Sequence, residues 1–169
     1  MKKDKTFKVG DKIIHHGQVY RIFKIRGERN KDKVIFFRRY FKSKKNRKLV
    51  CSIPIDSINK TNIRRLVSKK NLRDLFKTLS RKPEAKTAIN IIEAKEWLTL
   101  NSPDKNVEVL NRLWHEKKID PDHFNKTKEN VFKLAIEKLS EEVAFVSDVS
   151  LMKAGKKIKN ALEKNKSVR

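Results

Sequence analysis

The sequence predicts an α+β fold, in which a small β-barrel comes first and an all-α domain of about five helices follows. Two observations carry this prediction. Up to about residue 58, β-branched and aromatic residues alternate with polar ones in short runs separated by turn signals. From about Ser68, apolar residues recur instead at the i, i+3, i+4, i+7 spacing of amphipathic helices. We place the domain boundary at 62/63, giving domains over residues 1–62 and 63–169.

Four or five short strands are expected in the first domain. Phe7 and Val9 alternate with lysines ahead of a turn at Gly10. The later runs are residues 12–14, 19–25, 34–41 and 49–55. So many short strands predict a strongly bent barrel of the SH3 or Tudor type. Pro54 places the last run at a sheet edge or a strand end, because proline cannot donate a ladder hydrogen bond.

Five helices are expected in the second domain. The first helix follows a cap at Ser68, and the second spans residues 84–100. The third begins at Ser102-Pro103-Asp104, the fourth carries the apolar stripe 131–144, and the fifth follows a cap at Ser150. Pro83 and Asp120-Pro121-Asp122 are the expected breaks. Carboxylates of this domain, such as Glu141-Glu142, are interpreted as solvated helix surface.

The charge is strongly positive and uneven. The 169 residues include 44 Lys+Arg against 20 Asp+Glu, a formal charge of +24. Residues 1–82 hold 27 cations and 6 anions, a net +21, and residues 83–169 hold a net +3. A patch of this strength attracts polyanions and predicts salt-dependent nucleic-acid binding. A solvated, self-repelling surface is the alternative.

Several functional classes are excluded by the residues. No apolar run approaches the roughly 18 residues of a membrane span, and the first residues lack the apolar stretch of a secretory signal. The single Cys51 fits a reducing compartment, so we expect a cytoplasmic protein without membrane association. Four glycines provide no phosphate-binding loop, and Cys51 with the four histidines lacks metal-ligand spacing. A Cys51–His16 nucleophile pair is less favoured than a core cysteine, so we expect no enzyme, metal or cofactor.

Two basic stretches are candidate contact sites. The segment 42–48 holds five cations in seven residues, among them Lys44, Lys45 and Arg47. It could bind phosphates as a hairpin tip, or simply keep a loop soluble and protect a sheet edge. In Arg38-Arg39-Tyr40-Phe41 cations adjoin aromatics, which favours a partner surface. Strand alternation places Arg38 and Arg39 on opposite faces, so only one of them can belong to a given patch.

Several motifs together resemble one family. They are the opening Phe7-Lys8-Val9-Gly10-Asp11-Lys12-Ile13-Ile14 with His15-His16-Gly17, then Ile53-Pro54-Ile55-Asp56, residues 63–68, the Leu72-to-Leu79 helix, and residues 131–144. In order and spacing they resemble the CarD/CdnL family of bacterial transcription regulators, over residues 7 to about 162. The family shares its barrel with the RNA-polymerase-interacting domain of the transcription-repair coupling factor. The helicase motifs of that factor are absent from this sequence, which favours a stand-alone regulator.

The resemblance implies a mechanism. The barrel would dock on the β subunit of RNA polymerase through an exposed strand. The helical domain would contact promoter DNA, largely independently of sequence, while a tryptophan wedges into the minor groove and stabilises the open complex of initiation. We expect the protein to act as a monomer in transcription complexes at the nucleoid. The candidate polymerase contacts are Arg38, Arg39, Ser52, Ile53 and Pro54.

Candidate DNA contacts lie mainly in the helical domain. Lys86, Lys126 and Lys128 lie near expected helix starts, and Lys44, Lys45 and Arg47 could add contacts from the first domain. At the position of the family's wedge this chain reads Lys86-Thr87-Ala88-Ile89-Asn90, without an aromatic or an arginine. Trp97, about three turns later, is the candidate replacement, and core packing is the alternative for Trp97 and Trp114.

Two other functions remain open. A basic DNA- or RNA-binding protein that acts independently of polymerase would also explain the +21 on residues 1–82. A ribosome-associated Tudor-like protein is a third hypothesis.

Overall fold

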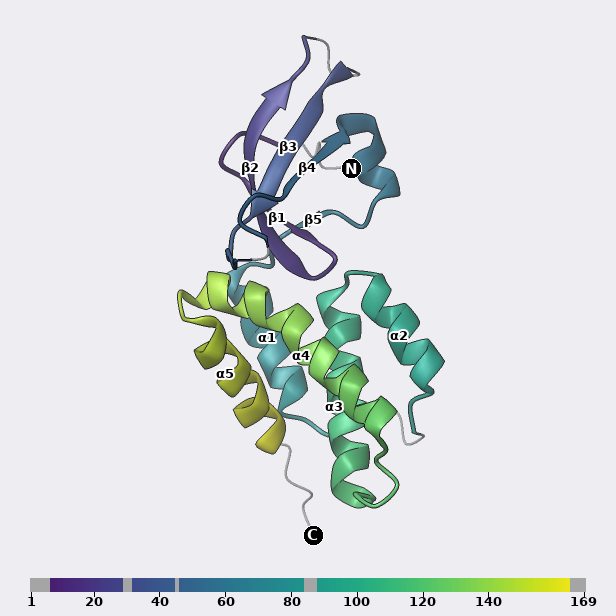
Figure 1. The fold of residues 1–169 in the computed structure, drawn as a ribbon. Coiled ribbons are helices and arrows are strands. Elements are labelled where there is room, and N and C mark those ends of the chain that lie inside the picture. The colour runs from purple at the N-terminus through teal and green to yellow at the C-terminus, as the bar shows by residue number, and fades with distance from the viewer. Residues whose placement is uncertain (1–6, 29–31, 45, 84–87, 165–169) are drawn as a thin grey trace. The chain divides into compact units, whose positions relative to one another are not determined.

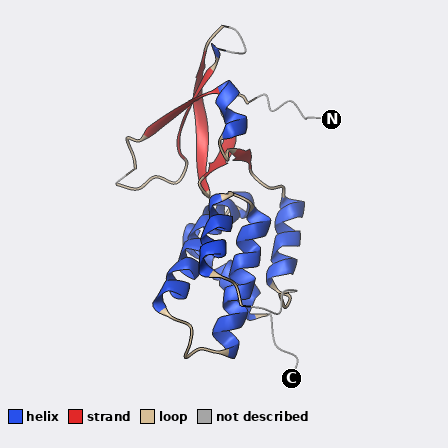
Figure 2. Ribbon diagram, turned by 90° about the vertical axis from the view of Figure 1, so that its right-hand side faces the viewer, coloured by secondary structure: helices blue, strands red, loops and turns tan. Residues whose placement is uncertain are grey.

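The computed structural model divides the chain into two compact units, Met1–Leu66 and Val67–Arg169 (Figure 1). It describes residues 7–28, 32–44, 46–83 and 88–164. The described strands lie in the first unit and the described α-helices in the second (Figure 2), so the α+β class is confirmed. The division falls four residues beyond the predicted 62/63 boundary, because Arg64–Arg65 pair with the first strand of the sheet.

The first unit is a five-stranded antiparallel sheet with the strand order β4-β3-β2-β1-β5. The strands are β1 (Lys12–His15), β2 (Gln18–Arg26), β3 (Val34–Arg39), β4 (Val50–Pro54) and β5 (Arg64–Arg65), and a 3-10 helix, η2 (Ile55–Lys60), follows β4. Among the described residues no pairing joins β4 to β5, so the sheet has two edges and the expected barrel closure is not seen. The expected strand around Phe7 and Val9 is absent, since these residues precede a turn at Gly10, where φ is +97°.

A β-bulge in β2 determines which residues reach the core. Ile22 pairs with Phe37 and Lys24 with Phe36, so Phe23 is an extra residue between them. The bulge turns both Ile22 and Ile25 toward the apolar side of the sheet, although their spacing of three would otherwise place them on opposite faces. The buried core comprises Phe7, Ile13, Tyr20, Ile22, Ile35, Phe37, Ile58 and Ile63, and Ile25, Cys51, Ile53 and Ile55 pack against it.

The described part of the second unit contains five helices, each with a side chain that caps its first turn. They are α1 (Lys69–Leu79), α2 (Ile91–Thr99), α3 (Pro103–Ile119), α4 (Lys126–Ser147) and α5 (Leu151–Glu163). The expected caps Ser68, Ser102 and Ser150 each accept a backbone N–H. The helix expected over 84–100 begins only at Ile91, because the Asn90 side chain accepts the N–H of Ile92 (2.8 Å) and sets the first turn there.

Two buried polar side chains join helices to neighbouring backbone. The interpretation of Glu141 and Glu142 as solvated surface is wrong, because both residues of α4 are buried. Glu142 is 1% exposed, and its carboxylate accepts the N–H of Val67 (2.8 Å). Asn111 of α3 donates to the carbonyls of Thr78 (3.1 Å) and Arg81 (2.8 Å), which lie around the end of α1. These bonds satisfy backbone groups that helix ends otherwise leave unpaired, so they help to hold α1 against α3 and α4.

We predict that Glu142→Ala lowers the free energy of unfolding of the helical unit by about 1–3 kcal/mol, because it leaves the partly buried N–H of Val67 without its carboxylate partner. Both tryptophans lie in this unit, so tryptophan fluorescence during urea denaturation follows it selectively. The matched control is Glu137→Ala on the exposed side of the same helix, with a change within about 0.5 kcal/mol. Equal effects of the two substitutions would contradict the role of Glu142.

We also predict that acid selectively weakens the sheet unit. The His15 ring lies 5.9 Å from Phe37 and 6.0 Å from Tyr20, and its burial, together with the nearby His16, lowers the pKa of His15 below its ordinary 6.5. The unfolded chain therefore binds this proton more readily, and the contribution of His15 to stability is lost as the pH falls below about 6.5.

An NMR titration of the His15 ring protons should give a midpoint below 6.5. His15→Gln should make unfolding of the sheet unit less pH-dependent between about pH 7 and 5. His123→Gln, which changes a histidine of the helical unit, should leave the unfolding of the sheet unit as it is. A midpoint at or above 6.5 would show the prediction to be wrong.

Candidate protein- and nucleic-acid-binding surfaces

The edge strand β4 has a defined hydrogen-bonding direction. Just beyond it, the N–H of Ile55 donates to the carbonyl of Lys33 (2.8 Å), and the same register pairs Ile53 with Ile35. In an antiparallel pair, only every second residue directs its backbone groups toward the neighbouring strand. Ile53 and Cys51 therefore use their N–H and C=O groups toward β3, and their side chains pack against the core.

The alternate residues of β4 turn their backbone groups outward. Val50 and Ser52 each direct their N–H and C=O away from β3. Pro54 also directs its C=O away from β3 but has no N–H. All three side chains are exposed. This edge can therefore accept one further strand, with Ser52 as its central donor and acceptor and Pro54 limiting the ladder at one end.

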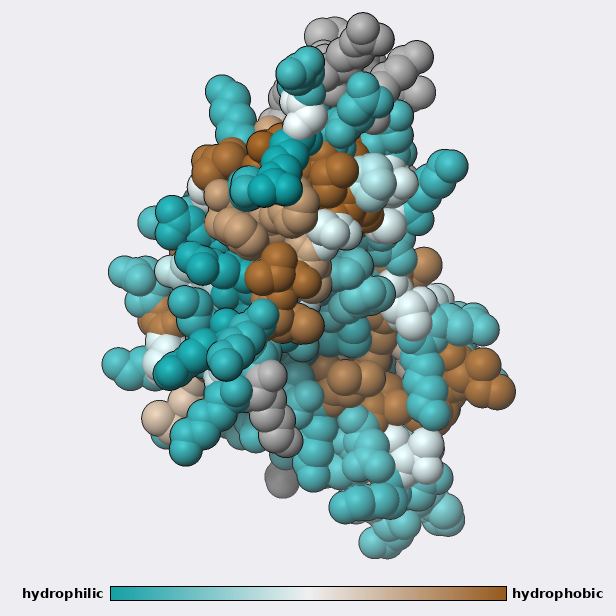
Figure 3. All heavy atoms as spheres, turned by 45° about the horizontal axis from the view of Figure 1, so that its top comes forward, coloured by the Kyte–Doolittle hydropathy of each residue, from teal (hydrophilic) through white to brown (hydrophobic). Residues whose placement is uncertain are grey.

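The sheet surface opposite the core, which we call the outer face, carries cations and aromatics. Its exposed or half-buried members on β2, β3 and β4 are Arg21, Phe23, Lys24, Arg26, Val34, Phe36, Arg38, Val50, Ser52 and Pro54. These ten residues include four cations and no acid. Figure 3 shows one side of the molecule, on which hydrophobic patches are bordered by hydrophilic residues.

Cations on the outer face lie directly opposite one another. Lys12 pairs with Arg21 and Arg21 with Arg38, which makes a row of three positive charges across β1, β2 and β3. Like charges at directly opposed positions repel one another and destabilise a sheet. An anion bound across this row would relieve that repulsion. The guanidinium of Arg38 lies 5.3 Å from the Phe23 ring centre, close to the same row.

Arg26 lies in the same way over Phe36, 5.8 Å from the ring centre. Cations beside aromatic faces on an open sheet can bind a phosphate and a stacked planar base together. The outer face thus suits an unpaired nucleic-acid strand better than a small neutral ligand. Sequence reasoning missed Arg21, Phe23 and Lys24 as one group, because strict alternation separates Phe23 from Lys24 and only the bulge brings both to this face.

The two arginines of β3 have different surroundings. Arg38 is exposed on the outer face, whereas Arg39 is half-buried and its guanidinium lies 5.5 Å from the ring centre of Tyr20. The prediction that they occupy opposite faces is confirmed. Of the candidate polymerase contacts, Arg38, Ser52 and Pro54 therefore belong to one continuous exposed surface, and Ile53 supports it from the core side.

The basic loop between β3 and β4 is organised by Asn46. Its side-chain oxygen accepts the N–H of Ser43 (2.7 Å), and its amide donates to the carbonyl of Phe41 (3.4 Å). Lys44 and Arg47 are exposed around this turn, so both can reach a phosphate. Lys45 lies outside the described residues.

Candidate DNA contacts of the helical unit differ in how much of their charge is used internally. Lys126 is exposed in the first turn of α4, whereas Lys128 is partly buried and forms an ion pair with Glu116 of α3. Lys128 would have to leave Glu116 to bind a phosphate, which makes Lys126 the better candidate. Lys86 lies outside the described residues.

Trp97 is engaged within the helical unit. Its half-buried ring lies 3.8 Å from the ammonium of Lys105 and 5.9 Å from the guanidinium of Arg112, both on α3. Trp114 stacks on Phe132, with ring centres 6.0 Å apart. These contacts favour the packing interpretation for both tryptophans, because a wedge residue must present its ring to DNA.

The net charge divides more evenly between the two structural units than between the two halves of the sequence. Residues 1–66 hold 21 Lys+Arg and 5 Asp+Glu, a net +16, and residues 67–169 hold 23 and 15, a net +8. The cations of α1 belong to the helical unit, although the division at residue 82 counted them with the first half. Both units are thus basic enough to attract a polyanion.

The described residues contain no group of three or more His, Cys, Asp or Glu side chains that could hold a metal ion. In that part of the chain, no helix combines the length and apolar character needed to cross a membrane. No protein-family model matches the chain, and no curated protein matches it. The resemblance to the CarD/CdnL family therefore stays a prediction from the sequence motifs.

We predict that the double substitution Arg21→Ala with Arg38→Ala weakens binding of a 20-nucleotide single-stranded DNA. Two lost phosphate contacts should reduce the slope of log K against log salt by about 1.4 for a single strand. Because the substitutions also remove opposed charges, the sheet unit should unfold no more easily than before. Fluorescence anisotropy at several salt concentrations measures the slope.

The matched control is Lys95→Ala with Lys159→Ala, which removes the same charge from exposed sites on α2 and α5. An unchanged slope in the outer-face variant, or an equal change in the control, would show that the outer face does not bind the strand.

Proposed function

We propose that this protein is a transcription regulator of the CarD/CdnL type. The sheet unit, an incompletely closed Tudor- or SH3-like barrel, docks on the β subunit of bacterial RNA polymerase through the open edge of β4. Cations of the protein contact promoter DNA largely independently of its sequence, and the two contacts together stabilise the open complex of initiation.

The open edge of β4 is the observation that carries this proposal. Its outward N–H and C=O groups at Val50 and Ser52 are suited to β-augmentation, in which a partner strand extends the sheet. Exposed Arg38 lies opposite Val50 on the neighbouring strand and adds a charge beside this edge. The motif order that resembles the family supports the choice of polymerase as the partner.

DNA contact in the proposal comes from cations rather than from a wedge. Lys126, Lys44 and Arg47 are exposed and lie in loops or a first helical turn, where they can approach a phosphate backbone. Trp97 has its ring occupied by Lys105 and Arg112, so we leave it out of the DNA contact. The expected consequence is DNA binding with a strong salt dependence and little sequence preference.

A second candidate function is single-stranded DNA or RNA binding without polymerase. The outer face favours it, because the row of opposed cations and the Phe23 and Phe36 rings suit a nucleic-acid strand without any partner protein. The two functions use different parts of the same sheet, its edge and its outer face, and can therefore be separated by substitution.

We predict that Ser52→Pro lowers retention of purified RNA polymerase on the immobilised protein at least about tenfold. The substitution removes the outward N–H at the centre of β4, and it spares the β3 ladder because Ser52 does not donate toward β3. Ser52→Ala is the matched control, since it keeps this N–H and should retain polymerase as the unsubstituted protein does.

Ser52→Pro should leave the binding of free single-stranded DNA unchanged, because the cations of the outer face remain in place. Failure of the unsubstituted protein to retain the β subunit at low salt would contradict the polymerase proposal. In that case, persistent binding of free nucleic acid would favour the second candidate function.

A further inference from the structure

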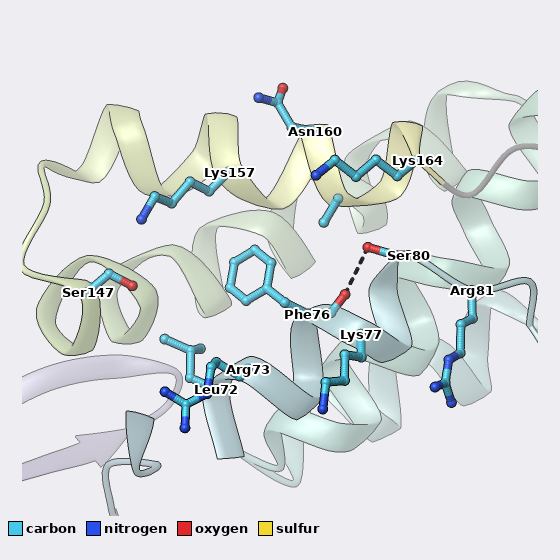
Figure 4. A pocket seen from close by; sticks show the side chains of 11 residues that line it. Leu72, Arg73, Phe76, Lys77, Ser80, Arg81, Ser147, Lys157, Asn160 and Lys164 are labelled. Carbon is cyan, nitrogen blue, oxygen red and sulfur yellow. Dashed lines mark hydrogen bonds between the residues drawn. The ribbon is translucent and has the colours of Figure 1, made fainter. Parts of the chain in front are cut away.

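A groove opens between α1 and α5 of the helical unit, beside the end of α4, with a volume of about 820 Å³. Its floor is apolar: Leu72 and Ala161 are buried there, and the half-buried Phe76 ring stands between the two helices (Figure 4). None of the functions considered above uses this groove. Its floor is part of the surface that packs α1 against α5, left open on one side.

The rim of the groove is strongly basic. Arg73, Lys77 and Arg81 contribute from α1 and its end, and Lys157 and Lys164 contribute from α5 and its end (Figure 4). Among the described residues, no acidic side chain lines the groove. The carboxylate of Asp74 pairs with Lys77 at 3.0 Å, and Asp74 itself lies outside the lining.

We propose that this groove binds an acidic amphipathic helix of a partner protein, a role beyond the proposed function. Such a helix would place apolar residues spaced i, i+3, i+4, i+7 on Phe76 and the floor, and its flanking carboxylates would meet the cations of both rims. The described lining contains five cations and no acid, so its charge attracts an acidic partner helix and speeds its association. The same charge repels basic segments.

Other occupants fit the groove less well. A nucleic-acid backbone could pair with the cations but would leave the half-buried Phe76 ring in contact with water. The residues that follow Lys164 in this sequence, Asn165 to Arg169, include two cations and no acid, so their charge opposes the rim. The combination of an apolar floor and a basic rim thus points to a helix with both an apolar and an acidic face.

The test uses the full chain and a fluorescein-labelled 18-residue peptide with leucines at the spacing above and glutamates on both flanks. The peptide should bind, and ¹⁵N NMR shifts should concentrate on α1 and α5. Arg73→Glu with Lys157→Glu should weaken binding about tenfold or more, because two attractive contacts become repulsive. Lys95→Glu with Lys159→Glu, which makes the same charge change at exposed sites outside the groove, should have a much smaller effect.

Two comparison probes identify the occupant. A peptide with lysines in place of the glutamates should bind at least about tenfold more weakly, since it meets the rim with like charge. A 20-base-pair DNA duplex should bind both double variants equally. Three results would overturn the proposal: equal binding of the two peptides, NMR shifts centred elsewhere, or DNA binding reduced by the groove variant alone. The polymerase-retention test is independent of each of these outcomes.

Discussion

The register of β2 against β3 is the constraint on which the sheet unit and its surfaces depend. The extra residue Phe23 lets Ile22 and Ile25 share the apolar side, and the same shift brings Lys24 to the opposite side with Arg21 and Phe23. A one-residue change in this register would bury cations and expose the isoleucines. The core thus excludes every other register, and the resulting outer face collects charges that repel one another.

The β4 edge follows from the same arrangement. Cys51 and Ile53 pack on the core, and their backbone groups face β3. The backbone groups of Ser52 point away from β3, and its side chain lies on the outer face. Core packing therefore determines which N–H a partner strand would meet. In the helical unit, the partly buried hydrogen bonds of Glu142 and Asn111 help to hold α1 against its neighbouring helices. One side of α1 then lines the groove with α5.

Local signals in the sequence predicted the parts of this fold that depend on local physics. Three such features depend only on residues that are close in sequence. They are the helix caps at Ser68, Ser102 and Ser150, the edge position that Pro54 predicts for β4, and the opposite faces of Arg38 and Arg39. Features that depend on tertiary contacts could not be predicted. The bulge at Phe23 appears only once β3 is paired, and the burial of Glu142 requires Val67, 75 residues away in sequence.

The central claim is that β4 pairs with a strand of RNA polymerase, and hydrogen–deuterium exchange measures this most directly. The full chain would be labelled with and without a molar excess of bacterial RNA polymerase, at low salt, and exchange compared at Val50 and Ser52, whose N–H groups point away from β3. The account predicts slowed exchange at these two amides in the complex. A complex in which they exchange as fast as in the free protein, while other segments become protected, would contradict it.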